Sequence, residues 1–268
     1  MLKDITLGQY FPGKSLIHRL DPRCKLVFLV LFIVAVFLAV SWVSYGLLLL
    51  LLVFSIQVSK VPVKAFVKGM KPLLFILVFT AGLNLFFTQG EQPLVDFWVI
   101  QIYPEGILRA IFMLARILML VMATFLLTYT TSPIALTDGL EGLLSPLKVI
   151  KLPVHELSMM MCIALRFIPT LIEETDKIMS AQKARGADFE TGSLMRRVKA
   201  LVPILVPLFI SAFRRADELA TAMECRCYQG GDGRSKMKLL RFAGRDYYAF
   251  LTGAAVIAAV CLLRRFGL

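Results

Sequence analysis

The sequence predicts an all-α integral membrane protein with about five transmembrane helices and a cytoplasmic-side region of amphipathic helices. Hydrophobic residues make up 58% of its 268 residues and the mean hydropathy is +0.77, whereas soluble globular domains contain about 45–50% apolar residues. Several apolar stretches approach the roughly 20 residues that a helix needs to cross a bilayer. The formal net charge is +12. We attribute it to cytoplasmic loops, which collect Lys and Arg in membrane proteins, and expect no nucleic-acid partner.

The predicted spans cover residues 25–40, 43–58, 72–87, 106–129 and 247–263. Only Ser41 and Trp42 separate the first two spans, so we expect an antiparallel pair joined by a tight turn. The chain is then expected to consist of an N-terminal membrane part with four spans (1–129), a region of amphipathic helices (130–246) and a C-terminal span (247–268).

Charged residues orient these spans. Basic residues precede the first span and follow the second: Lys3, Lys14, Arg19, Arg23, Lys25, Lys60, Lys64, Lys68 and Lys71. The segment 88–105 has no Lys or Arg, and it carries Trp98 and Tyr103, which suit a membrane interface. We therefore expect the N-terminus and the lysine segment, a loop after the second span, to lie inside the cell, and the loop 88–105 to lie outside. This orientation places Arg264 and Arg265 outside, against the same rule.

Two further apolar stretches, 152–170 and 198–213, are expected to lie along the cytoplasmic interface. The second contains Pro203 and Pro207, which disfavour a helix interior, and basic clusters flank both of its ends. The first carries charged side chains, among them Arg166, which are costly in the middle of a membrane. Helices with one apolar and one charged side are typical of membrane interfaces.

An internal repeat lies in the same region. Residues 175–186 align with residues 216–227, and the spacing of apolar positions predicts a helix in each segment. Arg185 and Arg226 occupy matching positions near the two helix ends. Glycines come after these ends, where a helix C-terminus favours them: Gly186, Gly230 and Gly231.

A single arginine near a helix C-terminus has a simple electrostatic explanation, because cations suit that end of the helix dipole. Two arginines at matched positions favour docking to a partner, since the guanidinium presents a rigid fork of donors to carboxylates. The predicted docking residues are Ala184, Arg185, Gly186, Cys225, Arg226 and Cys227.

The repeat also aligns opposite charges, because Glu173 and Glu174 correspond to Arg214 and Arg215. If the two helices cross about a local pseudo-twofold axis, equivalent positions approach each other and these charges can pair. The alternative is that both clusters are solvated or face lipid headgroups. An exposed pair then contributes only about 0–1 kcal/mol.

Other motifs indicate no catalytic, nucleotide or metal site. Residues 8–15 match the P-loop expression, but such a loop comes after a buried strand and opens a helix, and here Pro22 interrupts the segment next to the match. Cys225-x-Cys227 is at most half of a metal site, because such a site usually needs four ligands. We therefore expect no cofactor.

Two features remain open. Arg116 lies in the middle of the fourth span, where a charge usually has a structural partner or a functional role. The cysteines are scattered and form no disulfide framework, which fits a reducing compartment or the membrane: Cys24, Cys162, Cys225, Cys227 and Cys261.

Taken together, these residues resemble a known family. The opening GQYFPGKSLIHRLDPRCKL (residues 8–26) resembles the N-terminal signature of the transmembrane (T) subunit of energy-coupling factor transporters, and is closer to the shared, vitamin-serving type. The paired arginine helices resemble that family's coupling helices, whose X-Arg-X motifs are often Ala-Arg-Gly. Residues 184–186 match fully, whereas residues 225–227 keep the arginine and differ at both flanks.

The resemblance implies a role in an ATP-driven uptake system of the cell membrane. Two ATP-binding-cassette ATPase subunits would each receive one coupling helix end, and a separate membrane subunit would capture the substrate. This chain would neither hydrolyse ATP nor select the substrate. The alternative is a self-contained secondary transporter or channel, which would favour inverted repeats of spans. The repeat lies outside the predicted spans, and this favours the coupling subunit.

Overall fold

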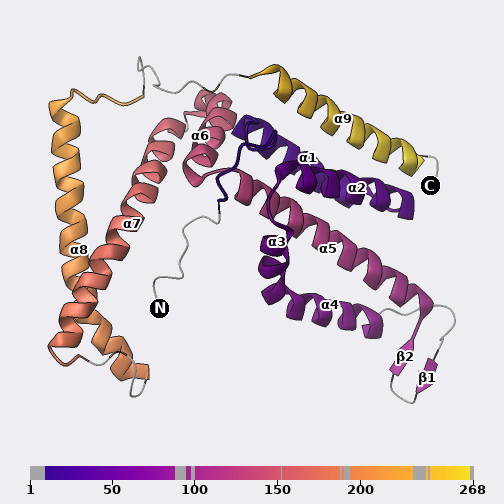
Figure 1. Ribbon diagram of the computed structural model, residues 1–268, viewed down its shortest axis with the longest axis horizontal. Coiled ribbons are helices and arrows are strands. Elements are labelled where there is room, and N and C mark those ends of the chain that lie inside the picture. Colours follow the sequence, from indigo (N-terminus) through magenta and orange to yellow (C-terminus); the bar gives the residue numbers. More distant parts are fainter. Residues whose placement is uncertain are drawn as a thin grey trace. The chain divides into compact units, whose positions relative to one another are not determined.

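The computed structural model describes residues 10–87, 95–97, 100–151, 153–187, 189, 194–231, 240 and 242–265. Its α-helices are α1 (Pro22–Leu38), α2 (Trp42–Ser59), α3 (Val63–Met70), α4 (Leu74–Phe87), α5 (Pro104–Thr130), α6 (Pro133–Leu144), α7 (Val154–Ala184), α8 (Leu194–Cys225) and α9 (Gly244–Arg265) (Figure 1). Two short 3-10 helices are η2 (Lys71–Leu73) and η3 (Ser145–Ile150), and one antiparallel hairpin pairs β1 (Val95–Phe97) with β2 (Ile100–Ile102). The predicted all-α class is confirmed, with this hairpin as a small exception.

The chain divides into two compact units. One, the membrane unit, contains Gly8–Gly139 and Leu239–Leu268 and therefore holds α1 to α5 and α9. The other, the crossing unit, contains Leu140–Lys238 and holds α7 and α8. The described part of the crossing unit is thus one contiguous segment of the sequence. In the membrane unit, the last helix, α9, packs against the first, α1.

The five predicted spans fall on α1, α2, α4, α5 and α9. Within the described ranges, the helical segments long and apolar enough to cross a membrane are Trp42–Ser59, Val63–Leu85, Gly106–Thr130, Val154–Ala184 and Gly244–Arg265. This set contains α7, whose expected place along the interface stays a prediction. It does not contain α1, which has only 17 residues.

Helix α1 is fixed mainly by α9 and α5. Asp21 caps its start by accepting a hydrogen bond from the backbone N–H of Arg23, and Pro22 suits the first turn because its missing N–H would be unpaired there. The tight connection to α2 is as predicted, and Ser41 caps α2 by accepting from Ser44 N. However, α1 packs chiefly against α9 and α5, with few contacts to its sequence neighbour α2.

The lysine segment after α2, expected to be a loop, is partly helical. Helix α3 places Phe66 in the core, where its ring lies 5.1 Å from that of Tyr129 on α5, and leaves Lys64 and Lys68 exposed. Burial of one large apolar side chain, with charges on the other face, explains why this short segment is helical. The lysines are therefore held on a surface helix.

The apolar stretches 152–170 and 198–213, expected to be helices along the membrane interface, are continuous with the helices of the repeat. The structure joins each stretch to its repeat in one long helix, α7 with 31 residues and α8 with 32. Pro203 and Pro207 lie inside α8. Each proline removes one backbone hydrogen bond but fixes φ at a helical value, so these prolines weaken the helix without ending it.

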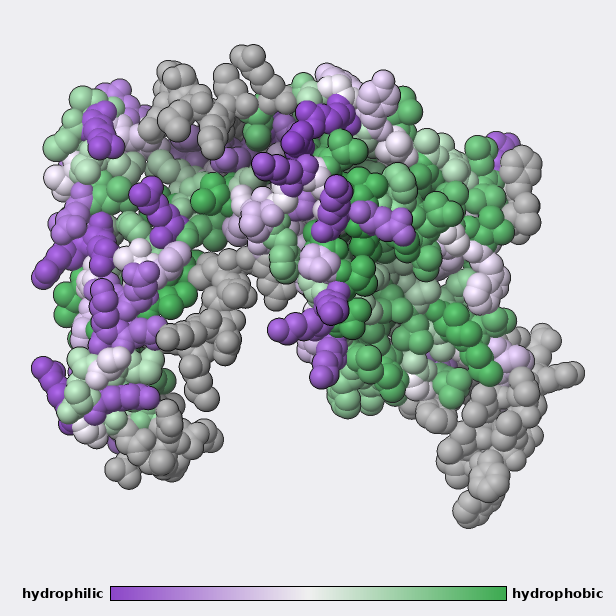
Figure 2. Space-filling view, viewed as in Figure 1, coloured by the Kyte–Doolittle hydropathy of each residue, from purple (hydrophilic) through white to green (hydrophobic). Residues whose placement is uncertain are grey.

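The surface of the two units differs in polarity. Figure 2 shows largely hydrophobic side chains over α1, α2 and α5, and hydrophilic side chains gathered over α7 and α8. The core of the membrane unit includes Phe32, Val36, Leu48, Phe66 and Val260, all at most 4% exposed. The many apolar side chains left on its outer faces are expected for helices that contact lipid.

Candidate functional site

The C-terminus of α7 is built by a specific turn. Arg185 is the C-cap residue, and Gly186 comes next with φ +85°, in the left-handed region that favours glycine. Ala187 N donates to Gln182 O at 3.0 Å, and Gly186 N donates to Lys183 O at 3.0 Å. These two bonds define a Schellman motif, which satisfies the last carbonyl groups of a helix.

The C-terminus of α8 has the same turn. Cys227 takes the left-handed position with φ +53°. Tyr228 N donates to Met223 O at 3.1 Å, and Cys227 N donates to Glu224 O at 2.8 Å. Each of these residues aligns with its counterpart in α7 under the repeat, so Cys227 plays the part of Gly186. Arg226 accordingly occupies the position of Arg185.

Both turns present their arginines to solvent. The six predicted docking residues are all exposed: Ala184, Arg185, Gly186, Cys225, Arg226 and Cys227. Neither guanidinium makes a hydrogen bond or an ion pair with the residues that the structure describes. Because each helix ends at the residue immediately before its arginine, no further helical turn covers the side chain. The geometry leaves two equivalent cationic ends free for a partner.

The expected role of Gly230 and Gly231 at the end of α8 is wrong. The helix ends at Cys225, and Cys227 forms the capping turn. Gly231 instead lies against His155 at the start of α7, where an added Cβ would fall 2.5 Å from the imidazole Cδ2. The absence of a side chain at this position lets the segment after α8 approach α7.

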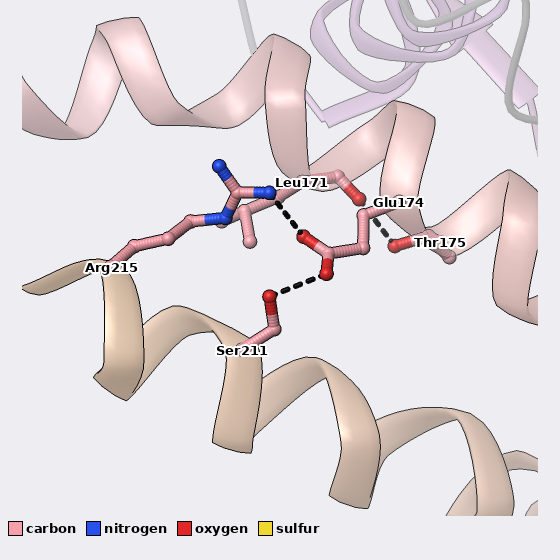
Figure 3. Close-up of polar contacts among 5 residues, drawn as sticks. All are labelled: Leu171, Glu174, Thr175, Ser211 and Arg215. Atoms are coloured by element: carbon pink, nitrogen blue, oxygen red, sulfur yellow. Dashed lines mark hydrogen bonds and ion pairs between the residues drawn. The ribbon is translucent and has the colours of Figure 1, made fainter.

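The two long helices cross near a charged cluster (Figure 3). Arg215 Nη2 lies 3.1 Å from Glu174 Oε2, and Ser211 on α8 donates a hydrogen bond to the other carboxylate oxygen. The side chains of Arg215 and Glu174 are 40% and 23% exposed, so the pair is only partly open to water. These two residues are equivalent under the repeat. Their contact is the one expected at a local pseudo-twofold crossing.

The neighbouring charges do not meet. Glu173 and Arg214, both described by the structure, are exposed and form no ion pair with each other. Only one glutamate of the pair 173–174 and one arginine of the pair 214–215 therefore contact each other at the crossing. Figure 1 shows the C-termini of α7 and α8 at opposite ends of the crossed pair. Glu174 and Arg215 each lie eleven residues before the arginine of their own helix, or about 16 Å along it.

A second buried polar centre, not found from the sequence, joins three helix ends in the membrane unit. The Asp246 carboxylate accepts from Asp21 N at 2.9 Å and from Ala243 N at 2.8 Å. Lys25 Nζ donates to Thr130 O at the end of α5, at 2.9 Å. Asp246 is 2% exposed. The start of α1, the end of α5 and the start of α9 are thus held together.

The residues that match the P-loop expression form a different local structure. Gly8 lies outside the described residues, and α1 begins only at Pro22. His18 Nε2 lies 2.9 Å from Phe11 O and Nδ1 lies 2.6 Å from Ser15 Oγ. A carbonyl can only accept, so Nε2 carries the proton and Nδ1 accepts from the hydroxyl. Burial lowers the pKa of His18, which favours this neutral ring.

Arg116 has a structural partner. Its Nε and Nη2 lie 3.1 and 2.9 Å from the Tyr45 hydroxyl oxygen on α2, and its guanidinium lies 5.5 Å from the centre of the Phe37 ring. The contact joins α5 to α2.

Among the described residues there is no group of three His, Cys, Asp or Glu side chains that could hold a metal ion.

The chain is similar to known proteins over almost its whole length. The family model described as "CbiQ: Cobalt transport protein" matches residues 13–239. A Clostridium kluyveri protein named "Energy-coupling factor transporter transmembrane protein EcfT" is 53% identical over 266 residues, covering 99% of this chain and 98% of that protein. Proteins of the same name from Ruminiclostridium cellulolyticum and Bacillus subtilis are 52% and 48% identical, and cover 96% and 98% of this chain and 95% and 100% of their own lengths.

The family model includes both arginine-ended helices. The alignment with the Clostridium kluyveri protein includes 266 of the 268 residues, and therefore also the apolar helices. Several of those helices have the length and composition to cross a membrane, and the relatives are named as transmembrane proteins. The chain therefore belongs to the CbiQ family, as a multi-pass transmembrane component of energy-coupling factor transporters.

Proposed function

We propose that this chain is the coupling subunit of an ATP-driven uptake transporter, and that it transmits the motions of two ATP-binding-cassette ATPase subunits to a separate substrate-capturing membrane subunit. The chain itself is not catalytic. Its cargo is a vitamin, in keeping with the resemblance of its N-terminal signature to the vitamin-serving type. Residues 1–129 and 247–268 form the membrane part, and residues 130–246 form the coupling region.

The matched ends of α7 and α8 carry this proposal. Each ends in an exposed arginine held by a Schellman turn, without a partner in the described chain. One such end has a simple explanation in the helix dipole, whereas two ends built with the same hydrogen bonds suit two copies, or two homologues, of one partner. A guanidinium fork fits a carboxylate in two-point contact, so we expect an acidic groove on each ATPase.

The crossing explains how a push at one end reaches the rest of the coupling region. The Glu174–Arg215 pair fastens the two helices at equal distances from their arginines. Long helices are stiff, so displacement of either arginine end turns its helix about the crossing. Two ATPases that approach each other would then change the angle between α7 and α8, and the exposed apolar faces of these helices would carry that change to the membrane subunit.

The basic residues support a cytoplasmic place for the coupling region. Helices α1 and α9 begin, and helices α2 and α5 end, at the same end of the membrane unit. The exposed lysines of α3 and the exposed Arg19 lie at this end. The positive-inside rule places that end in the cytoplasm. We then expect the N-terminus and the coupling region to lie in the cytoplasm, where ATP is available. The chain itself lies in the cell membrane.

The test is a charge reversal at both ends. In the assembled complex, Arg185→Glu with Arg226→Glu should reduce vitamin uptake severely and weaken ATPase attachment, because an unpaired charge in a desolvated contact costs about 2–5 kcal/mol. Lys199→Glu, an exposed reversal elsewhere on α8, is the matched control and should retain both activities. Co-purification of the ATPases, uptake and ATP hydrolysis are measured for each variant.

Normal assembly and uptake in the double arginine variant would refute the docking assignment. The competing function is a self-contained secondary transporter or channel. Uptake by the purified chain alone, in liposomes without ATPases, would establish that alternative and overturn the proposed function.

A further inference from the structure

A cavity of about 390 Å³ opens in the membrane unit. Its walls come from the same end of four helices: residues 24–32 of α1, 51–58 of α2, 123–130 of α5 and 245–252 of α9. Leu16, Ile17 and Leu20, from the turn that precedes α1, also line it. The walls are almost entirely apolar, and the volume lies within the roughly 300–1,000 Å³ typical of ligand sites. The cavity is therefore large enough for a ligand with a substantial apolar part.

One face of α9 lines this cavity in a graded order. Arg245, Tyr248, Ala249 and Thr252 lie at the spacing of successive helical turns and share this face. Arg245 and Tyr248 are exposed, and within the described chain neither side chain makes a hydrogen bond or ion pair. Ala249 and Thr252 are small and leave the space beyond them open. The face thus runs from a cation and a hydroxyl at the mouth to an apolar interior.

The other charges near the mouth are already satisfied. Lys25 also lines the cavity, but its Nζ donates to Thr130 O at 2.9 Å and to Thr131 Oγ1 at 3.2 Å. The Asp246 carboxylate accepts two backbone N–H groups. Arg245 is consequently the lining cation that still lacks a counterion in the described structure.

We propose that this cavity binds one anionic phospholipid of the cytoplasmic leaflet. One of its acyl chains enters between α1, α2, α5 and α9, and its phosphate accepts hydrogen bonds from Arg245 and Tyr248. A guanidinium fits a phosphate in two-point contact, and arginine and tyrosine suit the headgroup level of a membrane. A lipid at this place would brace the three helix ends that Asp246 and Lys25 join.

The volume excludes a helix of another protein as the main occupant. A helix is about 10 Å across with its side chains, so a cavity of about 390 Å³ can take only single side chains from one. An acyl chain is one methylene wide and needs no hydrogen bonds, which suits apolar walls. The assignment to the cytoplasmic leaflet rests on the proposed orientation of the chain, whereas lipid binding itself does not.

The experiment compares lipid retention among variants of the full chain in its complex. Purified complex in detergent is incubated with phosphatidylglycerol and phosphatidylcholine of identical acyl chains, and native mass spectrometry counts the lipids retained. Arg245→Gln should lower the preference for phosphatidylglycerol by about fivefold, the effect expected of one cation at a membrane surface. Arg264→Gln, an exposed arginine at the other end of α9, is the matched control and should keep the full preference.

A second pair of variants tests the chain-binding part. Ala249→Leu and Thr252→Leu fill the cavity and should reduce retention of both lipids. Equal preference in Arg245→Gln and Arg264→Gln, or undiminished retention in both filled variants, would overturn the proposal. Loss of a protein subunit on filling, with lipid retention unchanged, would identify a protein side chain as the occupant and would overturn it too. Lipid retention does not measure ATPase attachment. A failure of the lipid proposal can therefore be distinguished from a failure of the proposed coupling function.

Discussion

The ion pair at the helix crossing allows a sharp test of how α7 and α8 are fastened. Glu174→Gln removes the carboxylate charge while leaving an oxygen that can accept from Ser211. Arg215→Met removes the guanidinium donors while keeping much of the apolar stem that packs on the neighbouring helix. The double-mutant cycle built from these changes isolates the coupling energy between the two side chains.

The structure sets the expected magnitude of that coupling. The two charged atoms lie 3.1 Å apart, and the side chains are 40% and 23% exposed. Fully exposed pairs contribute about 0–1 kcal/mol, whereas breaking a buried pair costs about 3–5 kcal/mol. A partly buried pair with a 3.1 Å contact is closer to the first case, so we expect a coupling energy of about 1 kcal/mol. For a chain of this size, that energy shifts the Tm by about 2–4 °C.

The assay is thermal unfolding of the complex in detergent for the wild type, both single variants and the double variant. The matched control is the cycle of Glu173→Gln with Arg214→Met, two exposed residues that form no ion pair with each other. Control effects should add within about 0.3–0.5 kcal/mol. Additive losses in the Glu174–Arg215 cycle, or equal coupling in the control cycle, would refute the assignment of this pair to the crossing.

The remaining predictions concern helix ends and one histidine. Gly186→Ala should destabilise the α7 turn by about 1 kcal/mol because φ is +85° and nothing else crowds the site, whereas Cys227→Gly should keep or raise the Tm; a lower Tm for Cys227→Gly would contradict the shared turn geometry. Asp246→Ala should cost about 2–4 kcal/mol, since it removes a cap and leaves a buried N–H group unpaired, and a Tm within about 1 °C of wild type, equivalent to about 0.3 kcal/mol, would argue against the buried centre. The pKa of His18 is lowered from its ordinary 6.5, so its contribution is fully present above about pH 6.5 and is lost as the pH falls through the folded-state pKa. Acidification from about pH 7.5 to about 5.5 should lower the Tm of wild type more than that of His18→Gln, and equal shifts would contradict the buried neutral ring.

The predicted helix ends differ from the observed ones in an instructive way. The spans at 43–58 and 106–129 fall within two residues of α2 and α5 at each end, because long apolar runs leave little freedom in where a helix begins and ends. The segment after α2 was expected to be a loop, yet α3 forms there because Phe66 packs beside Tyr129. That contact depends on a residue far along the chain, and local periodicity cannot show it.

The prolines of α8 show that the continuity of a helix also depends on tertiary packing. In the sequence, Pro203 and Pro207 argue against a helix interior at this position, whereas the structure keeps one helix of 32 residues through both prolines. The local cost of a proline is visible in the sequence, but the packing of α8 on α7 that offsets the cost is not. Whether a helix ends at a proline depends on the balance between this local cost and the stabilisation from packing.

The sequence by itself determined the all-helical membrane class, the family, and the two matched arginines, because each of these depends on local composition, periodicity or an ordered motif. Tertiary structure alone decided that Glu174 and not Glu173 meets an arginine, that Cys227 takes the same left-handed turn as Gly186, and that Asp246 joins the helix ends. Rotation of a helix by one residue, about 100°, separates a side chain that faces its neighbour from one that faces solvent. That rotation is set by how whole helices pack, and no short stretch of sequence contains it.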